Sequence, residues 1–135
     1  MTDTFVHLGL HSEYSLADSV VRIKPLMEAV REKNMPAVAL TDQCNVFAMV
    51  RFYRAALAAG IKPIVGADVW INEGEETPPS RLRLLCRDRQ GYGNLCELLS
   101  DGFRDPRVHG RPVVSRGRLK VLGPTPVHRR SFRPV

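Results

Sequence analysis

The sequence predicts an α/β fold for most of its 135 residues. Short apolar runs alternate along the chain with stretches in which apolar residues recur every three or four positions. The first pattern is typical of buried strands and the second of amphipathic helices. Because the connections between them are short, we expect mainly parallel strands joined by right-handed crossovers. The content of 44% hydrophobic and 25% charged residues is that of one globular domain.

The composition also excludes several classes of protein. Charged residues interrupt every apolar run well before the roughly 18 residues that a membrane span needs. The N-terminus has no basic stretch followed by an apolar one, so we expect no secretory signal. Three cysteines at unrelated spacings (Cys44, Cys86 and Cys96) favour reduced thiols over a disulfide framework or a zinc site. We therefore expect a cytoplasmic protein.

The net charge of +6 belongs to one end of the chain. Residues 1–103 contain 11 Lys and Arg against 13 Asp and Glu, whereas residues 104–135 contain 9 against 1. The second segment also holds five of the ten prolines and shows no hydrophobic periodicity. A segment of this composition packs poorly. We expect a folded body over residues 1–103 and a disordered basic tail over residues 104–135.

The first elements follow from apolar spacing and from two prolines. Residues 5–10 are a short apolar run, which predicts a buried strand that ends at His11. Residues 22–33 have apolar positions at helical spacing, which predicts a helix. Pro25 falls early in this helix, where a missing N–H costs little, and Pro36 prevents its continuation.

The second half of the body repeats the alternation of strand and helix. A buried strand is predicted at residues 37–40, followed by a helix with Asn45 as its side-chain cap and Gly60 as its end. The apolar stripe of this helix, which should pack on the strands, comprises Phe47, Val50, Tyr53, Ala56 and Leu57. Three further elements are predicted: strands at residues 61–71 and 81–86, and an amphipathic helix at residues 92–103.

Polar side chains lie at the ends of the predicted strands, where functional groups gather in α/β folds. His11 follows the first strand, Gln43 follows the second, and Asp68 belongs to the third. His11 and Asp68 could bind a divalent metal ion through imidazole and carboxylate groups. With so few ligands, the capping of turns is the simpler interpretation. No phosphate-binding glycine loop and no GxSxG nucleophile pattern is found in the sequence.

Four long segments of the chain invite comparison with known families: FVHLGLHSEYSLADS, MPAVALTDQCN, FYRAALAAGIKPIVGADVW and RLRLLCRDRQGYGNLCELLS. Over about residues 5–103 they resemble, in order and spacing, the N-terminal PHP (polymerase and phosphatase) domain of the alpha subunit of bacterial DNA polymerase III, above all its proteobacterial form. The resemblance implies a distorted parallel α/β barrel, of which this chain would hold the N-terminal portion.

The resemblance also implies the positions of a metal site. Metal-binding PHP domains carry an HxH motif after the first strand, TDH after the second, GxE after the third, and a histidine at the start of an HLxLL strand. In this chain the corresponding positions are occupied by Gly9, Gln43, Asp68 and Arg81. Glycine supplies no ligand, an amide oxygen is a weak one, and a guanidinium repels a divalent cation.

By this resemblance the site is degenerate. Ligands are lost at Gly9, Gln43 and Arg81, and the vestigial site consists of three residues: His11, Asp18 and Asp68. We therefore expect no intact metal site, no catalytic residue and no cofactor in this chain. A scaffold role is the function that the resemblance then implies.

For a full-length member the resemblance implies DNA-directed DNA synthesis with magnesium, carried out by domains beyond this length. It implies the proofreading epsilon subunit, other holoenzyme subunits and DNA as partners, and no membrane. Residues 110–116 still resemble the family and residues 117–135 do not, so we expect an inactive fragment that is out of frame after about residue 116. Two alternatives stay open: an independent PHP-type metal-dependent phosphoesterase, and a small basic protein that binds nucleic acid through residues 104–135.

Overall fold

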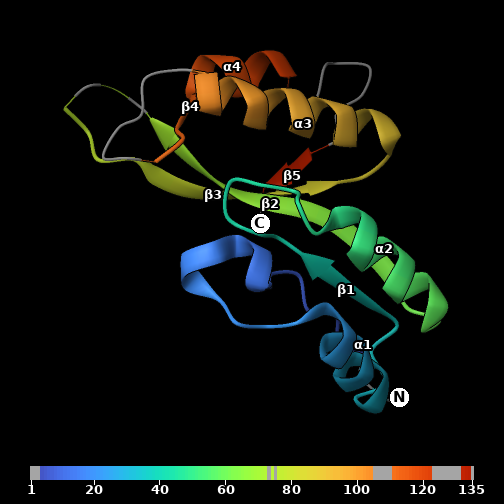
Figure 1. Cartoon of the computed structure of the whole chain (residues 1–135). Helices are drawn as coiled ribbons and strands as arrows, with labels where there is room; N and C mark the ends of the chain where they lie inside the picture. The colour runs from blue at the N-terminus through green and yellow to red at the C-terminus, as the bar shows by residue number, and fades with distance from the viewer. Residues whose placement is uncertain (1–3, 73, 75, 105–110, 123–131, 135) are drawn as a thin grey trace.

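The computed structural model describes residues 4–72, 74, 76–104, 111–122 and 132–134. The elements, in chain order, are a 3-10 helix η1 (Glu13–Asp18), α1 (Ile23–Glu32), β1 (Ala37–Leu40), α2 (Met49–Ala58), β2 (Lys62–Asn72), β3 (Ser80–Cys86), α3 (Arg89–Arg104), β4 (Val114–Ser115), α4 (Arg116–Leu122) and β5 (Phe132–Pro134). Helices α3 and α4 lie along the hairpin formed by β2 and β3, whereas α1 and α2 lie beside β1 (Figure 1). None of the helices in these residues is long and apolar enough to cross a membrane.

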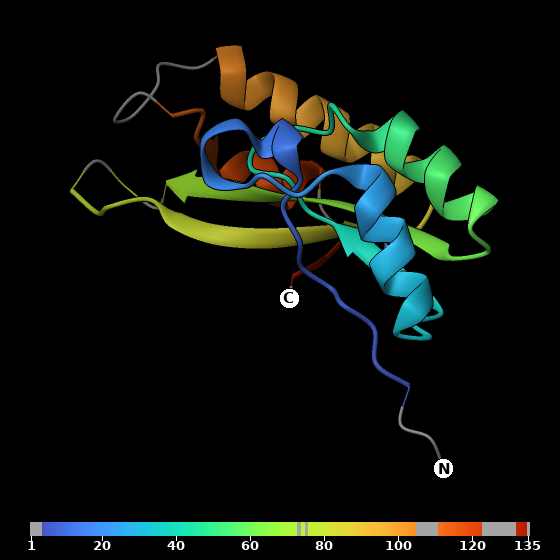
Figure 2. The same ribbon diagram turned by 60° about the horizontal axis from the view of Figure 1, so that its bottom comes forward.

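The strands form one mixed sheet in the order β1-β2-β3-β5, with β4 beside β2. This arrangement confirms the α/β class predicted from the sequence. The expected parallel pairing holds for β1 with β2 and for β2 with β4. Strands β2 and β3 are antiparallel and form a hairpin that projects beyond the helices (Figure 2). The connection at residues 73–79 is shorter than the roughly dozen residues that a parallel crossover needs.

The strand predicted at residues 5–10 is not a regular strand. This segment runs extended along β1 with a single isolated bridge, between His7 and Val38. The carbonyls of His7 and Leu10 each accept a hydrogen bond from β1 or the residue after it, both at 2.8 Å. The Leu10 N–H, however, donates to the Thr41 hydroxyl at 3.2 Å. The two carbonyls are three residues apart, whereas their partners Ala39 and Thr41 are two apart, so the pairing leaves the register of a regular ladder.

Two separate apolar clusters form the core. The first joins α1, β1 and α2, and its largest fully buried side chain is Phe52. The second joins β2, β3 and α3, with Leu84, Leu95 and Leu98 fully buried. Strand β2 connects the two clusters, since its first half pairs with β1 and its second half pairs with β3. This strand therefore joins the two halves of the domain.

Helix α2 buries a different face from the predicted one. Ala48, Phe52 and Ala56, four residues apart, pack with residues of α1 and β1. Of the predicted stripe only Ala56 is buried, and the others are exposed: Phe47, Val50, Tyr53 and Leu57. Apolar residues occur on both faces of this helix, so their spacing alone did not identify the face that packs.

Asn45 lies in the turn before α2 rather than at the helix cap. Its side-chain oxygen accepts a hydrogen bond from the Phe47 N–H at 3.1 Å. Its side-chain nitrogen donates to the carbonyls of Tyr14 and Gln43, at 3.0 and 3.2 Å. Helix α2 itself begins at Met49 without a side-chain cap. Asn45 therefore joins η1 to the loop after β1 instead of starting the helix.

Part of the expected tail, residues 111–122 and 132–134, is described by the structure. Val113 and Val114 are buried, and α4 packs on α3. The Arg118 guanidinium pairs with Glu97 and Asp101 of α3. These contacts connect α4 and the two valines to the body of the domain. Residues 105–110 and 123–131 of the expected tail lie outside the described residues.

The burial of α2 predicts opposite behaviour for two phenylalanines. Phe52→Ala should lower the free energy of unfolding by about 3–5 kcal/mol, because it removes a fully buried ring. Phe47→Ala should change it by less than about 0.5 kcal/mol, because that ring is exposed. Urea denaturation followed by circular dichroism measures both. Equal losses for the two variants would contradict the observed orientation of α2.

Candidate functional site

The candidate site lies where the segment after residue 10, the end of η1 and the middle of β2 meet. His11 lies between two carboxylates: its Nδ1 is 2.9 Å from Asp18 Oδ2 and its Nε2 is 2.7 Å from Asp68 Oδ2. The three residues predicted as a vestigial site are therefore in direct contact. Since both ring nitrogens are engaged, the orientation of the imidazole is fixed by the two carboxylates.

Arg83 is the principal site residue that the sequence analysis missed. It lies opposite Asp68 in the register of β2 and β3. Its Nε donates to Asp68 Oδ1 at 2.7 Å and its Nη2 donates to Asp68 Oδ2 at 3.0 Å. This is the two-pronged pairing for which a guanidinium is suited. Asp68 is completely buried, so Arg83 supplies the charge that its carboxylate needs.

Arg81, which the resemblance indicated as the cation of the site, lies elsewhere. It pairs across the hairpin with Trp70 and is exposed. The alternation Arg81-Leu82-Arg83-Leu84 places both arginines on one face of β3, two residues apart. Only the register with β2 shows which of them reaches Asp68. Sequence spacing alone carried no such signal.

Gly9 provides the space that Arg83 occupies. A Cβ atom added at Gly9 would overlap with the guanidinium of Arg83. Any side chain at position 9 and the observed placement of Arg83 therefore exclude each other. The absence of a histidine at this position and the presence of the arginine are two parts of one arrangement.

Gln43 joins the same group of residues. Its backbone forms an isolated bridge with Asp68. In the amide orientation that satisfies both neighbours, its nitrogen donates to Asp18 Oδ2 at 2.8 Å and its oxygen accepts from Trp70 Nε1. The amide thus holds Asp18 toward His11 and orients Trp70. Of the six residues named from the sequence, Gly9 and Arg81 make no side-chain contact in this group. The other four are linked by contacts: His11, Asp18, Gln43 and Asp68.

A second buried carboxylate, Asp42, supports this edge of the sheet. Asp42 Oδ1 accepts a hydrogen bond from the Ser12 N–H at 2.5 Å, and Oδ2 accepts one from the Ser12 hydroxyl at 2.7 Å. Burial raises the pKa of Asp42, and the two bonds from Ser12 oppose that rise. The pair ties the chain after His11 to the end of β1. Its role is to hold the backbone, which the sequence did not indicate.

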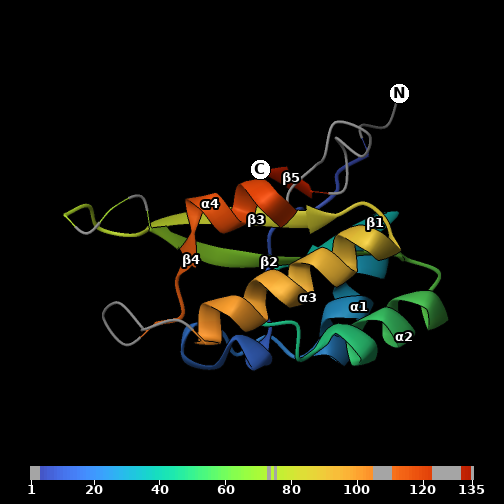
Figure 3. The same ribbon diagram turned by 90° about the horizontal axis from the view of Figure 1, so that it is seen from above.

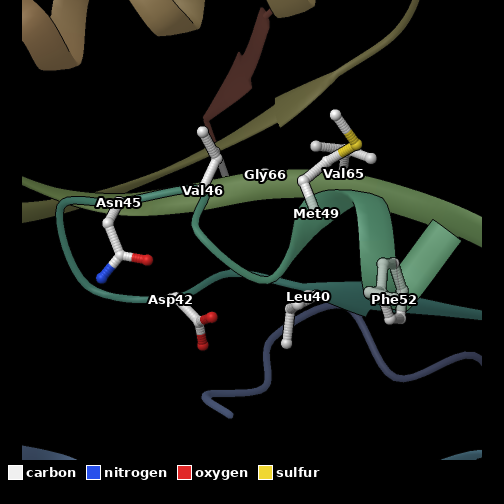
Figure 4. Close-up of a pocket in the computed structure, with 8 residues that line it drawn as sticks. All are labelled: Leu40, Asp42, Asn45, Val46, Met49, Phe52, Val65 and Gly66. Atoms are coloured by element: carbon white, nitrogen blue, oxygen red, sulfur yellow. The ribbon is translucent and has the colours of Figure 1, made fainter. Parts of the chain in front are cut away.

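The enclosed space beside Asp42 is too small for a ligand. A cavity of about 10 Å³ lies between the loop after β1, α2 and β2 (Figure 4). Its walls are formed mainly by apolar side chains such as Leu40, Met49 and Phe52. This volume has room for about one water molecule. The cavity is therefore a packing feature and not a binding site.

Asp68 is the charged centre of the group. Burial raises the pKa of Asp68, but hydrogen bonds from Arg83 and His11 outweigh it and lower the pKa below the ordinary value of 3.8. The carboxylate is therefore ionised at neutral pH. The pKa of Arg83 is raised in turn by the hydrogen bond to Asp68, so both partners keep their charge.

These residues do not fit a metal ion. Both oxygens of Asp68 accept bonds from Arg83, and both nitrogens of His11 contact carboxylates. A divalent cation on Asp68 would lie against the fixed positive charge of Arg83. Among the described residues no group of three or more His, Cys, Asp or Glu side chains could hold a metal ion. The site is a salt-bridge network.

The overlap between Gly9 and Arg83 predicts energetic coupling. Arg83→Ala should lower the free energy of unfolding by about 3 kcal/mol, because Asp68 keeps a buried charge. Gly9→Ala should cost about 1–3 kcal/mol, because the guanidinium must move. In the double variant the cost of Gly9→Ala should fall by at least about 1 kcal/mol. A thermodynamic cycle from urea denaturation measures the coupling, and strict additivity would contradict the arrangement.

The lowered pKa of Asp68 predicts a loss of stability in acid. A depressed carboxyl pKa contributes stability above the unfolded value of about 3.8, and this contribution is lost as the pH falls through the folded value. The raised pKa of Asp42 acts with the opposite sign. Asp68→Asn should therefore be less stable than the unaltered chain at pH 7, with a difference that shrinks below about pH 4. Unfolding curves from pH 3 to 7 test this, and a constant difference would contradict it.

With this geometry in place, the chain can be compared with known proteins. Residues 7–122 match the PHP domain family. The DNA polymerase III alpha subunit of Pseudomonas aeruginosa is 50% identical over 121 residues, which cover 89% of this chain and 10% of that protein. The subunit of Pseudomonas fluorescens is 52% identical over 117 residues, covering 86% and 10%. The chain therefore spans about a tenth of the length of these relatives.

Two solved structures have a similar fold. One is a protein from Bifidobacterium adolescentis described as a metal-dependent phosphoesterase, with a TM-score of 0.53, 13% identity, and coverage of 72% of this chain and 32% of that chain. The other is an amidohydrolase from Chromobacterium violaceum with bound sulfate and no metal, with a TM-score of 0.50, 15% identity, and coverage of 73% and 34%. At these identities the likeness concerns the fold alone. The match over residues 7–122 and the 50% identity confirm the predicted resemblance: the chain belongs to the PHP domain family and is similar over most of its length to DNA polymerase III alpha subunits.

Proposed function

We propose that this chain is the N-terminal PHP module of a replicative DNA polymerase III alpha subunit and acts there as a metal-free scaffold. The observation that carries this proposal is the bidentate pairing of Arg83 with the buried Asp68 in the space above Gly9. A cation built into the chain performs the charge-balancing role that a bound metal ion would otherwise perform. The 50% identity to the Pseudomonas aeruginosa subunit supports the assignment to a polymerase.

The proposed scaffold is held by contacts among several segments. His11 connects η1 to β2 through Asp18 and Asp68, and Ser12 connects the same segment to β1 through Asp42. Such contacts need no exchangeable ligand and no open coordination position. A catalytic metal site keeps an open position for water or substrate. The arrangement thus favours a structural role over hydrolysis.

In the full-length protein the proposal includes DNA-directed DNA synthesis with magnesium by other domains. The proposed partners are the proofreading epsilon subunit, other subunits of the holoenzyme and DNA, and the proposed location is the cytoplasm. We also propose that residues 1–103 are the N-terminal part of a PHP domain and that residues 104–135 are a basic tail, out of frame after about residue 116. Resequencing of the gene beyond that codon tests the change of frame.

Metal analysis distinguishes the scaffold from a phosphoesterase. The 135-residue chain is purified, and circular dichroism checks that it is folded. Plasma mass spectrometry should then detect no stoichiometric metal in it. Added zinc or manganese should leave its melting temperature unchanged, since binding to the native state alone would raise it. Stoichiometric metal together with hydrolysis of a phosphoester would favour the phosphoesterase instead. Binding of a purified proofreading subunit from a Pseudomonas holoenzyme, followed by calorimetry, tests the scaffold role directly.

A further inference from the structure

Helix α2 carries an apolar stripe that the described part of the chain leaves exposed. Phe47, Val50, Tyr53 and Leu57 are 66%, 55%, 45% and 57% exposed. Val50, Tyr53 and Leu57 lie on one face of α2 at a spacing of three or four residues and span roughly 10 Å along the helix, and Phe47 lies in the turn just before the helix. Apolar surface of this extent marks sites of interaction.

A groove runs beside this stripe. It has a volume of about 580 Å³ and lies between α2, the start of β2 and the start of α3, two helices that are neighbours in Figures 1 and 3. Its apolar lining comes from all three elements and includes Met49, Val50, Tyr53, Pro63, Val65 and Tyr92. The groove shares no lining residue with the network around Asp68. It is therefore a separate surface of the domain.

The edge of the groove is positively charged. Arg54, Arg87 and Arg89 line it, all three are exposed, and none forms an ion pair within the described residues. Asp88 is the acidic residue among the described groove residues, and its Oδ1 accepts a hydrogen bond from the Gly91 N–H at 2.8 Å at the start of α3. An apolar floor with unpaired arginines around it is complementary to an apolar segment that carries carboxylates.

We propose that this groove docks an acidic amphipathic segment of a separate polypeptide. Apolar side chains of the segment pack on Val50 and Tyr53, and its carboxylates face the three arginines. Interfaces between separate proteins are enriched in Arg, Tyr and Met, whereas permanently buried interfaces are more hydrophobic. The helix-in-groove mode supplies the required spacing of apolar anchors. This inference rests on the proposed scaffold role, for which it names the docking surface.

The test uses a synthetic amphipathic peptide of about 16 residues, with leucines at helical spacing and glutamates elsewhere. A matched peptide carries lysine in place of every glutamate. The acidic peptide should bind the full 135-residue chain at least about tenfold more tightly than the basic one, because like charges at the rim oppose docking. The variant Arg87→Glu/Arg89→Glu should reverse this preference. Fluorescence anisotropy of labelled peptides measures all four affinities.

Apolar variants test the floor of the groove. Val50→Asp and Tyr53→Asp, both in the lining of the groove, should each weaken binding of the acidic peptide at least about tenfold, while Val20→Asp, at a residue 90% exposed outside the groove, should have no effect. The proposal would be overturned if the two peptides bound with equal affinity. It would also be overturned if Val50→Asp left the binding of the acidic peptide unchanged. A dimer in sedimentation that Val50→Asp dissociates would overturn it as well, since a second copy would then be the occupant. Circular dichroism confirms that each variant folds.

The scaffold role has a separate readout. If the proofreading subunit binds the unaltered chain and Val50→Asp equally well, the scaffold role stands and the groove is overturned as its docking surface. If Val50→Asp abolishes the binding of both the subunit and the acidic peptide, the two proposals are supported together. If the acidic peptide alone binds in the expected way, the groove is supported and the proofreading subunit is rejected as its occupant.

Discussion

The buried charge of Asp68 is the constraint on which this edge of the domain depends. A carboxylate with no exposure must be matched by charge and hydrogen bonds, or its burial destabilises the fold. Arg83 and His11 meet this requirement from two different parts of the chain. His11 in turn holds Asp18, and Gln43 reaches the same carboxylate. One buried group thus positions the N-terminal segment, η1 and the loop after β1 against the hairpin.

An arginine and a metal ion can both neutralise this site, but they differ in chemistry. A metal ion accepts exchangeable ligands, lowers the pKa of bound water and polarises a substrate oxygen. A guanidinium has only donors in a fixed plane and stays protonated. Arg83 therefore preserves the electrostatic balance of the site without the ability to activate water. The exposed groove beside α2 shares no residue with this network, so an interaction surface there does not depend on the chemistry of the site.

Much of this architecture follows from local sequence, and the predictions that were wrong or incomplete depended on contacts between distant segments. Apolar spacing and flanking prolines identified α1, β1, β2 and α3, because each buries one clear face or run. The prediction of the buried face of α2 was wrong because Phe52 and the exposed stripe are both apolar. Only packing against α1 determines which of the two faces is buried. Arg83 was missed for a similar reason: two arginines alternate on β3, and the register of the hairpin selects one. Residues 5–10 form no regular ladder with β1, because the bonded carbonyls of His7 and Leu10 are three residues apart while their partners are two apart.

The exclusion between Gly9 and Arg83 has a consequence for the history of the site. In a lineage that began with a side chain at position 9, that side chain had to disappear before, or together with, the entry of the guanidinium. Once Arg83 had bonded to Asp68, a new side chain at position 9 would meet the end of the guanidinium and could return only if that flexible side chain moved away. In such a lineage the loss of a side chain at position 9 is a simple step, whereas its return also requires Arg83 to leave its observed place.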